Sequence, residues 1–213
     1  MEPSSLRPAS GPRLAAHPPR RQAAVDSIIQ LGRGNQSVSN VERTFIILET
    51  ERLMLRRQQT SDIGPLVELW TDPEVTRYMG GPRDEGRLRS VFEETAQNSH
   101  AVRYDLWPVI EKETSRVVGH SGLLEKEVEG RSEIELIYVL ASSVWGEGYA
   151  TEIGRAMTRY ALEDMGIERL IALIEPENSA SERVAVKIGM RFEKEVVRSG
   201  GVVRKLYGIE SSG

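Results

Sequence analysis

The stretch WGEGYATEI, Trp145–Ile153, decides how the fold of this chain is interpreted. It follows an apolar run, IELIYVLASSV, and opens an amphipathic run, ATEIGRAMTRYALEDM, so its glycines stand where a strand is expected to give way to a helix. The first turn of a helix has N–H groups without partners, and the macrodipole makes that end positive. Glycines let the main chain approach a ligand closely. Gly146 and Gly148 therefore indicate an anion site, typically one for phosphate.

On these residues alone, several interpretations of the Gly-x-Gly stay open. A Walker A loop needs a lysine after the glycines, and GEGYATE contains none. A dinucleotide fingerprint needs a third glycine or alanine where Thr151 stands, and an early parallel strand–helix–strand unit. A pyrophosphate site for an acyl-CoA and a plain turn without any ligand both remain.

The composition of the 213 residues, with 39% hydrophobic and 28% charged, suits one folded domain of ordinary size. Cysteine is absent, which excludes disulfides and cysteine-bound zinc, and His17, His100 and His120 lack metal-ligand spacing. The net charge of −4 disfavours nucleic acid as a partner. No apolar run approaches the roughly 18 residues that span a bilayer, and no segment reads as a secretory signal. We therefore expect no membrane partner and a cytoplasmic location.

Residues 1–41 are rich in proline, serine, glycine and arginine and have no hydrophobic period. We expect a disordered tail there and one folded domain over residues 42–213. An arginine-rich, acid-poor N-terminus is also typical of a transit peptide, although an untargeted tail is the preferred interpretation.

The sequence of this domain predicts alternating strands and helices. A first strand is expected over Leu53–Arg57, a helix after Thr60-Ser61-Asp62, and a short helix over TDPEVTRYM with Asp72 as its cap. Another helix is expected in DEGRLRSVFEETAQNS, where apolar residues recur at helical spacing.

Three β runs come next, RYDLWPVIEK, RVVGHSGLLEKEV and SEIELIYVL, joined by short turns that make them antiparallel neighbours. They precede a helix over residues 150–165, a strand RLIALIEP, a helix ending at Gly189, and a hairpin that closes on Gly200-Gly201. This order predicts a mixed α/β (α+β) domain with a mostly antiparallel sheet flanked by helices.

A second motif, ENSASERVAVKIGMRFEKE, follows the next predicted strand. Together with WGEGYATE it resembles the GNAT N-acetyltransferase superfamily, and most closely its RimJ/RimL type, the ribosomal-protein N-terminal acetyltransferases. The family loop Gln/Arg-x-x-Gly-x-Gly/Ala maps onto Ser143, Gly146 and Gly148, so its first position departs from the pattern. The second motif maps onto Asn178, Ser181, Val184, Lys187, Gly189 and Met190. The likeness covers about Leu48 to Glu210 and includes TERLMLRR near its start.

The resemblance implies acetyl-CoA as the acetyl-donor cosubstrate and central strands that splay apart to admit its pantetheine arm. The main chain of the splayed strand, Asn178 and Lys187 are implied to bind the cofactor, with the loop holding the pyrophosphate. The implied cofactor residues are Val139, Leu140, Trp145, Gly146, Glu147, Gly148, Tyr149, Ala150, Thr151, Asn178, Ser181 and Lys187. Asn178 also suits a helix cap, and a lysine on a helix face is commonly just solvated.

The resemblance also implies direct attack of an amine on the thioester in a ternary complex. Glu135 is the best candidate for the base, because it aligns with the glutamate that precedes the Gly/Val-Tyr pair on this strand in the family. Glu133, on the same strand face, and a water chain are the alternatives. Ala185 stands where many relatives carry a tyrosine that meets the thiolate, so Ser181 becomes the candidate donor to the sulfur. For each of these residues an ordinary solvated or capping role is the alternative.

The expected acceptor is a primary amine, with a protein or peptide N-terminal α-amine first and a small amine (amino acid, polyamine or antibiotic) second. An α-amine has a pKa of about 7.7–8, against about 10.4 for lysine, so it needs less help from a base. A non-catalytic acyl-CoA-binding regulatory module is the alternative of another class. A homodimer is compatible with the sequence and is not required by it.

Overall fold

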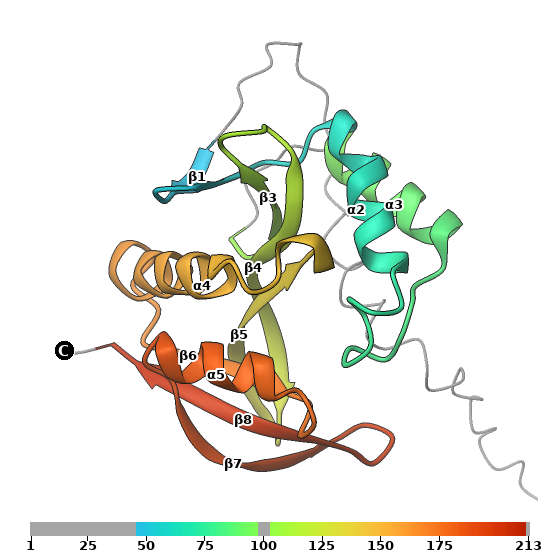
Figure 1. Ribbon diagram of the computed structural model, residues 1–213. Coiled ribbons are helices and arrows are strands. Elements are labelled where there is room, and N and C mark those ends of the chain that lie inside the picture. The colour runs from blue at the N-terminus through green and yellow to red at the C-terminus, as the bar shows by residue number, and fades with distance from the viewer. Residues whose placement is uncertain (1–45, 98–102, 212–213) are drawn as a thin grey trace, which may run out of the picture.

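The computed structural model describes residues 46–97 and 103–211. The expected N-terminal tail, residues 1–41, lies outside the described residues. An eight-stranded sheet runs in the order β1-β2-β3-β4-β5-β6-β8-β7. Helices α4 and α5 cover one face of the sheet, and α2 and α3 lie on the opposite face (Figure 1). The mixed α/β class with a mostly antiparallel sheet is confirmed.

The first part of the chain forms two short strands and two helices before the long strands begin. Its elements are β1 (Ile46–Glu49), β2 (Leu53–Arg56), a 3₁₀ turn (Thr60–Asp62), α2 (Ile63–Thr71), α3 (Glu85–Gln97) and β3 (Leu106–Glu111). The expected first strand is therefore the second arm of a hairpin, because Thr50 and Leu53 close a turn that pairs β1 with β2.

The short helix expected over TDPEVTRYM was wrong. Only one bond of the α-helical type forms, from Thr76 N to Asp72 O at 3.1 Å. The next two, from Arg77 N to Glu74 O and from Met79 N to Thr76 O, each span three residues. Gly80 and Gly81, with φ of 89° and 85°, then turn the chain away. Asp72 still acts as a cap, since its Oδ1 accepts the N–H of Glu74 at 2.8 Å.

The second part of the chain supplies the long strands and the two helices of the other face. Its elements are β4 (Val117–Val128), β5 (Arg131–Leu140), a 3₁₀ turn (Ser142–Val144), α4 (Tyr149–Arg159), a π-helical turn (Tyr160–Asp164), β6 (Arg169–Ile174), α5 (Ser179–Lys187), β7 (Arg191–Arg198) and β8 (Val202–Glu210). No helix in the part of the chain that the structure describes is long and apolar enough to cross a bilayer.

The sheet opens between its two central strands. β5 runs parallel to β6, and Glu135 and Ile171 are their one registered pair, whereas β4 and β5 pair along their whole length. Side chains alternate along a strand, so adjacent residues serve opposite faces. Leu123 belongs to the core under α4 and α5, and Leu124 to the core under α2 and α3. Residues of β5 beside the split therefore reach the α4/α5 face and the α2/α3 face in alternation.

The buried core also holds a histidine. His120 is 4% exposed, and its Nδ1 accepts the indole N–H of Trp70 at 3.1 Å. Its Nε2 meets no hydrogen-bond partner among residues 46–97 and 103–211. Burial lowers the pKa of His120 to about 4, so the ring stays neutral in the folded protein at neutral pH.

We expect acid to destabilise the fold through His120. The unfolded chain takes up a proton near its ordinary pKa of 6.5, while the folded chain resists until about pH 4. The free energy of unfolding should therefore fall by roughly 3 kcal/mol across that window. Urea titrations at several pH values measure it, with His120→Asn as the variant that keeps an acceptor for Trp70. An identical pH dependence in the variant would contradict the assignment.

Candidate active site

The Gly-x-Gly loop leaves the end of β5 and enters α4. Gly146 has φ of 86° and Gly148 has φ of 82°, left-handed values that side-chain-bearing residues rarely adopt. Gly148 is the N-cap of α4, so the glycine conformation itself aims the chain into the first turn of the helix. The expectation of glycine at a strand-to-helix junction thus has a backbone reason.

The loop presents a row of free N–H groups. Within the described residues, no hydrogen-bond acceptor meets the main-chain N–H of residues 146 to 150. The N–H of Thr151, expected in the same row, bonds to Gly148 O at 3.1 Å, and that of Trp145 bonds to Ser142 O at 3.2 Å. Five consecutive donors at the positive end of a helix fit a pyrophosphate. We call residues 146–150 the anion cradle.

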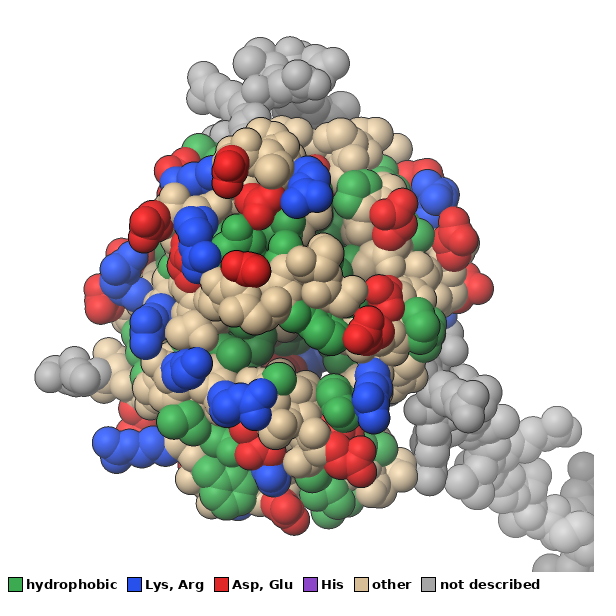
Figure 2. Space-filling model, viewed as in Figure 1, with side chains coloured by type: hydrophobic (Ala, Val, Ile, Leu, Met, Phe, Trp, Pro, Cys, Tyr) green, Lys and Arg blue, Asp and Glu red, His purple; other side chains and the backbone are tan. Residues whose placement is uncertain are grey.

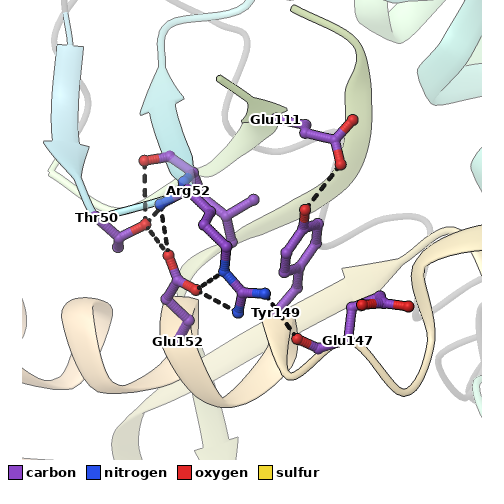
Figure 3. A network of polar contacts seen from close by, with 7 residues as sticks. Thr50, Arg52, Glu111, Glu147, Tyr149 and Glu152 are labelled. Atoms are coloured by element: carbon purple, nitrogen blue, oxygen red, sulfur yellow. Dashed lines mark hydrogen bonds and ion pairs between the residues drawn. The ribbon is translucent and has the colours of Figure 1, made fainter. Parts of the chain in front are cut away.

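Two ion-paired side chains fix the anion cradle to the turn between β1 and β2 (Figure 3). Glu152, in the first turn of α4, accepts from Arg52 Nε at 2.7 Å, from Arg52 N at 2.9 Å and from Thr50 Oγ1 at 2.5 Å. Arg52 Nη1 donates in turn to the carbonyl of Glu147 at 2.9 Å. Burial acts to raise the pKa of Glu152, but the bonds from Thr50 and Arg52 hold it below its usual value.

Tyr149 extends the same network to Glu111. The guanidinium of Arg52 lies 4.4 Å from the centre of the Tyr149 ring, and the Tyr149 hydroxyl donates to Glu111 Oε1 at 2.8 Å. A Cβ placed on Gly148 would lie 3.6 Å from Arg52 Nη2. Arg52 therefore lies against the Glu147 carbonyl and Gly148. It occupies no N–H group of the anion cradle, so these donors remain available to a ligand.

We expect Arg52→Ala to weaken acetyl-CoA binding about fivefold to twentyfold. The variant removes the hydrogen bond to the Glu147 carbonyl and the main partner of Glu152. The loop is then less ordered before binding, and ordering it lowers the free energy gained when acetyl-CoA binds. Calorimetric titration measures the change. Arg52→Lys, which keeps the charge but not the fork of donors, should recover only part of the affinity. An unchanged affinity in Arg52→Ala would show that the network does not position the loop.

Main-chain groups of β5 line the split. Ala141 N bonds to Val118 O at 2.9 Å, so by the alternation of an antiparallel ladder Val139 directs its groups to β4. A Cβ on Gly119 would meet Val139 O at 2.4 Å, which agrees. Tyr138 and Leu140 therefore face the split, although Leu140 O already accepts the indole N–H of Trp145 at 2.9 Å. Val139, expected to offer main-chain groups to the pantetheine arm, is turned away from it.

The second motif lies across the split from Tyr138. Asn178 caps α5, with Oδ1 accepting the N–H of Ser181 at 3.1 Å. The hydroxyl of Tyr138 donates to Ser181 O at 3.1 Å, so a side chain of β5 reaches the first turn of α5. The half-buried hydroxyl of Ser181 meets no partner in the described residues. Lys187 is exposed at the far end of α5 and touches the site only through its carbonyl, which accepts from Arg155.

Glu135 lies where β5 and β6 part. Burial raises the pKa of its carboxyl group, while Lys126, a hydrogen bond from the Leu173 N–H, Arg198 and Arg204 act to lower it. The Leu173 N–H belongs to β6, so the carboxylate occupies the point at which the parallel ladder stops. Glu133, two residues earlier, is engaged by Arg169 Nε at 3.2 Å. Glu135 is the freer of the two.

The surface is hollowed between α4 and α5 (Figure 2). The anion cradle lies at the N-terminus of α4, and the Tyr138 hydroxyl reaches the first turn of α5. The side chain of Glu135 lies on the opposite face of the sheet, because Glu135 stands opposite Leu124.

The expected residues Trp145 to Ala150 form the loop into α4, and Asn178 and Ser181 lie at the start of α5, which packs beside α4. Lys187 lies at the far end of α5. The sequence interpretation missed Arg52, Glu152 and Tyr138. TERL and GYATE were both noted as motifs, but nothing in their spacing shows that they touch.

The fold and this cradle define the class: an α/β protein that holds a phosphate-bearing cosubstrate beside a split sheet. A family model for the acetyltransferase (GNAT) domain matches residues 52–191. The uncharacterised protein YkkB of Bacillus subtilis (strain 168) is 33% identical over 150 residues, which cover 70% of this chain and 87% of YkkB. The uncharacterised N-acetyltransferase p20 of Bacillus licheniformis is 33% identical over 152 residues, 70% of this chain and 83% of p20.

A solved GNAT-family acetyltransferase from Bacillus anthracis is similar in three dimensions. It superposes with a TM-score of 0.64 at 28% identity, over 76% of this chain and 97% of that one. The chain therefore belongs to the GNAT acetyltransferase family. It is an acetyl-CoA-dependent N-acetyltransferase, and the free N–H groups of the anion cradle fit the pyrophosphate of that cosubstrate.

Proposed function

We propose that the chain acetylates a primary amine, with a protein or peptide N-terminal α-amine as the leading acceptor, in the manner of the RimJ/RimL type. The observation that carries the proposal is Glu135, a half-buried carboxylate where β5 and β6 part, on the sheet face opposite α4. Burial raises the pKa of the Glu135 carboxyl towards neutral pH, and a general base works best when its pKa is near the operating pH. An α-amine is already partly neutral at pH 7, so such a base is sufficient.

Each group has a task in this proposal. The N–H groups of residues 146–150 bind the pyrophosphate, and the main chain of Tyr138 and Leu140 and the amide of Asn178 bind the pantetheine arm. Acetyl-CoA, when bound, supplies an acetyl group activated as a thioester. Glu135 takes a proton from the amine nitrogen as the N–C bond forms and the C–S bond breaks. The Ser181 hydroxyl donates a hydrogen bond to the departing sulfur, and the proton taken by Glu135 is returned through water to the thiolate. In balance, one N–H becomes N–acetyl, and the free thiol of CoA is released.

A small amine is the second candidate acceptor, and one observation favours it. The tip of the β4–β5 hairpin touches the β7–β8 hairpin, because Arg198 donates to Glu127 O and Lys194 pairs with Glu129. In this proposal the contact limits the approach to Glu135 from the side of the sheet opposite α4. A long peptide would enter past it only by its end.

Calorimetry followed by an acceptor panel tests the proposal. We expect acetyl-CoA to bind, and free thiol to be released with peptides that have an unblocked N-terminus. Peptides of the same sequence with an acetylated N-terminus and an internal lysine are the matched controls. Faster turnover of small amines would favour the second candidate. Binding of acetyl-CoA without thiol release for any amine would point to a non-catalytic module instead.

A further inference from the structure

Four charged side chains share one face of the sheet around the apex of the split. Glu135 stands opposite Leu124, and Lys126 is two residues further along the same strand, so both point away from α4. Arg204 stands opposite Val196, and Arg198 is two residues beyond Val196 on β7. Val196 and Leu206 belong with Val128 and Ile171 to one small buried cluster on that face, to which the four charged residues are adjacent.

The two hairpins that carry these residues are folded against each other. Val128 of β4 packs with Val196 of β7, and Arg198 donates to the carbonyl of Glu127. Arg198 thus stands beside Lys126, and the two cations repel each other enough to lower the pKa of Lys126, although burial is the larger cause. The arrangement encloses Glu135 between cations from three strands.

The cations of this region differ in whether they are ion-paired. Arg204 pairs with Glu175, and Arg169 and Lys205 of neighbouring strands pair with Glu193 and Glu182 at 2.7 and 2.6 Å. Lys126 and Arg198 form no ion pair with a carboxylate among the described residues. Glu133 stands opposite Lys126 on the same face, but its carboxylate is bound by Arg169. Lys126 and Arg198 are therefore left without a contacting anion, which is costly for a half-buried cation.

We infer that Lys126 and Arg198 bind an anionic group, a carboxylate or a phosphate, that the acceptor carries near its amine. This inference rests on the proposed function. The ammonium of Lys126 and the guanidinium of Arg198 are both suited to such a group. The same pair of charges disfavours a polycationic acceptor, because the amine that reaches Glu135 would bring further positive charge beside them. The acceptor class is thus an amine with a nearby negative charge.

Matched acceptor pairs test the inference. The probes are glycine against glycinamide, phosphoethanolamine against ethanolamine, and a tripeptide amide beginning with Glu against one beginning with Gln. We expect kcat/KM to favour the anionic member of at least one pair by roughly tenfold to a hundredfold. The pairs separate a carboxylate from a phosphate, and an amino acid from a peptide.

Lys126→Gln is the decisive variant. Since Lys126 also acts on Glu135, the readout is the ratio of kcat/KM between the two members of a pair, from which a general change in the base cancels. We expect the ratio to fall towards one, and Lys126→Arg to restore it in part. Lys194→Gln, on the same face but paired with Glu129, is the matched control and should keep the wild-type ratio.

Binding of the same probes to the CoA-bound protein is measured in parallel by calorimetry. A preference for the anionic probe in binding, lost in Lys126→Gln, supports the inference even when no acetyl transfer occurs, and that outcome would overturn the proposed function alone. Turnover without a preference in any pair overturns the inference and leaves the proposed function intact. Failure of every anionic probe to bind more tightly than its neutral partner overturns it as well.

Discussion

Ala150→Pro is expected to weaken acetyl-CoA binding by roughly tenfold to a hundredfold while the fold survives. Proline removes the N–H of residue 150, which belongs to the anion cradle and meets no acceptor within the described residues. Because this position lies in the first turn of α4, no intrahelical hydrogen bond is lost. The expected change is the loss of one charge-assisted bond to phosphate, aggravated by a ring where that oxygen would lie.

Gly86→Pro is the control for this variant. Gly86 is the second residue of α3, as Ala150 is of α4, so the strain that proline imposes on the preceding residue is the same in both. Acetyl-CoA affinity is measured by calorimetry and folding by thermal unfolding. We expect Gly86→Pro to bind like the wild-type protein. Equal affinity in Ala150→Pro and the wild-type protein would mean that the cradle does not hold the pyrophosphate.

Glu135→Gln is expected to lower kcat by about 10²- to 10⁴-fold, the usual contribution of a positioned general base. The glutamine keeps the shape of the side chain, so acetyl-CoA affinity should change little. Glu133→Gln is the matched control, because Glu133 lies on the same face two residues earlier but is held by Arg169 at 3.2 Å. A fall in kcat as large in Glu133→Gln as in Glu135→Gln would contradict the assignment of Glu135 as the base.

The pH profile gives a second readout for Glu135. Its carboxyl pKa is raised by burial, so the acidic limb of kcat/KM should lie above the ordinary glutamate pKa of about 4.3. Activity is lost as the pH falls through that raised value, because the protonated carboxyl cannot accept the amine proton. The limb should disappear in Glu135→Gln, and its persistence would mean that another group titrates there.

Local sequence signals determined much of the fold. Gly146 and Gly148 predicted the strand-to-helix turn. Each has φ above 80°, a conformation that glycine adopts readily, so the residue type by itself marks the turn. Asn178 predicted the start of α5 in the same way, by capping the N–H of a residue three positions on. Where the local signal was weak, prediction failed: Asp72 caps a turn after which the chain does not stay helical, and Gly80 and Gly81 decide the outcome.

The anion cradle was visible in the sequence because its donors are consecutive residues. What holds it was not, because Arg52 and Glu152 are separated by 100 residues and meet only when β1–β2 packs on α4. The same holds for the Tyr138 hydroxyl and Ser181 O, 43 residues apart.

The sequence by itself thus determined the family and the glycine turn into α4, and it supplied Glu135 as the candidate base. The tertiary structure decided the surroundings of that base: Lys126, Arg198 and the Leu173 N–H come from strands distant in sequence. Helix caps and glycine turns depend on neighbours within a few residues, so a pattern encodes them. The electrostatic environment of Glu135 depends on side chains that only the closing of two hairpins brings together, and no spacing in the chain records that contact.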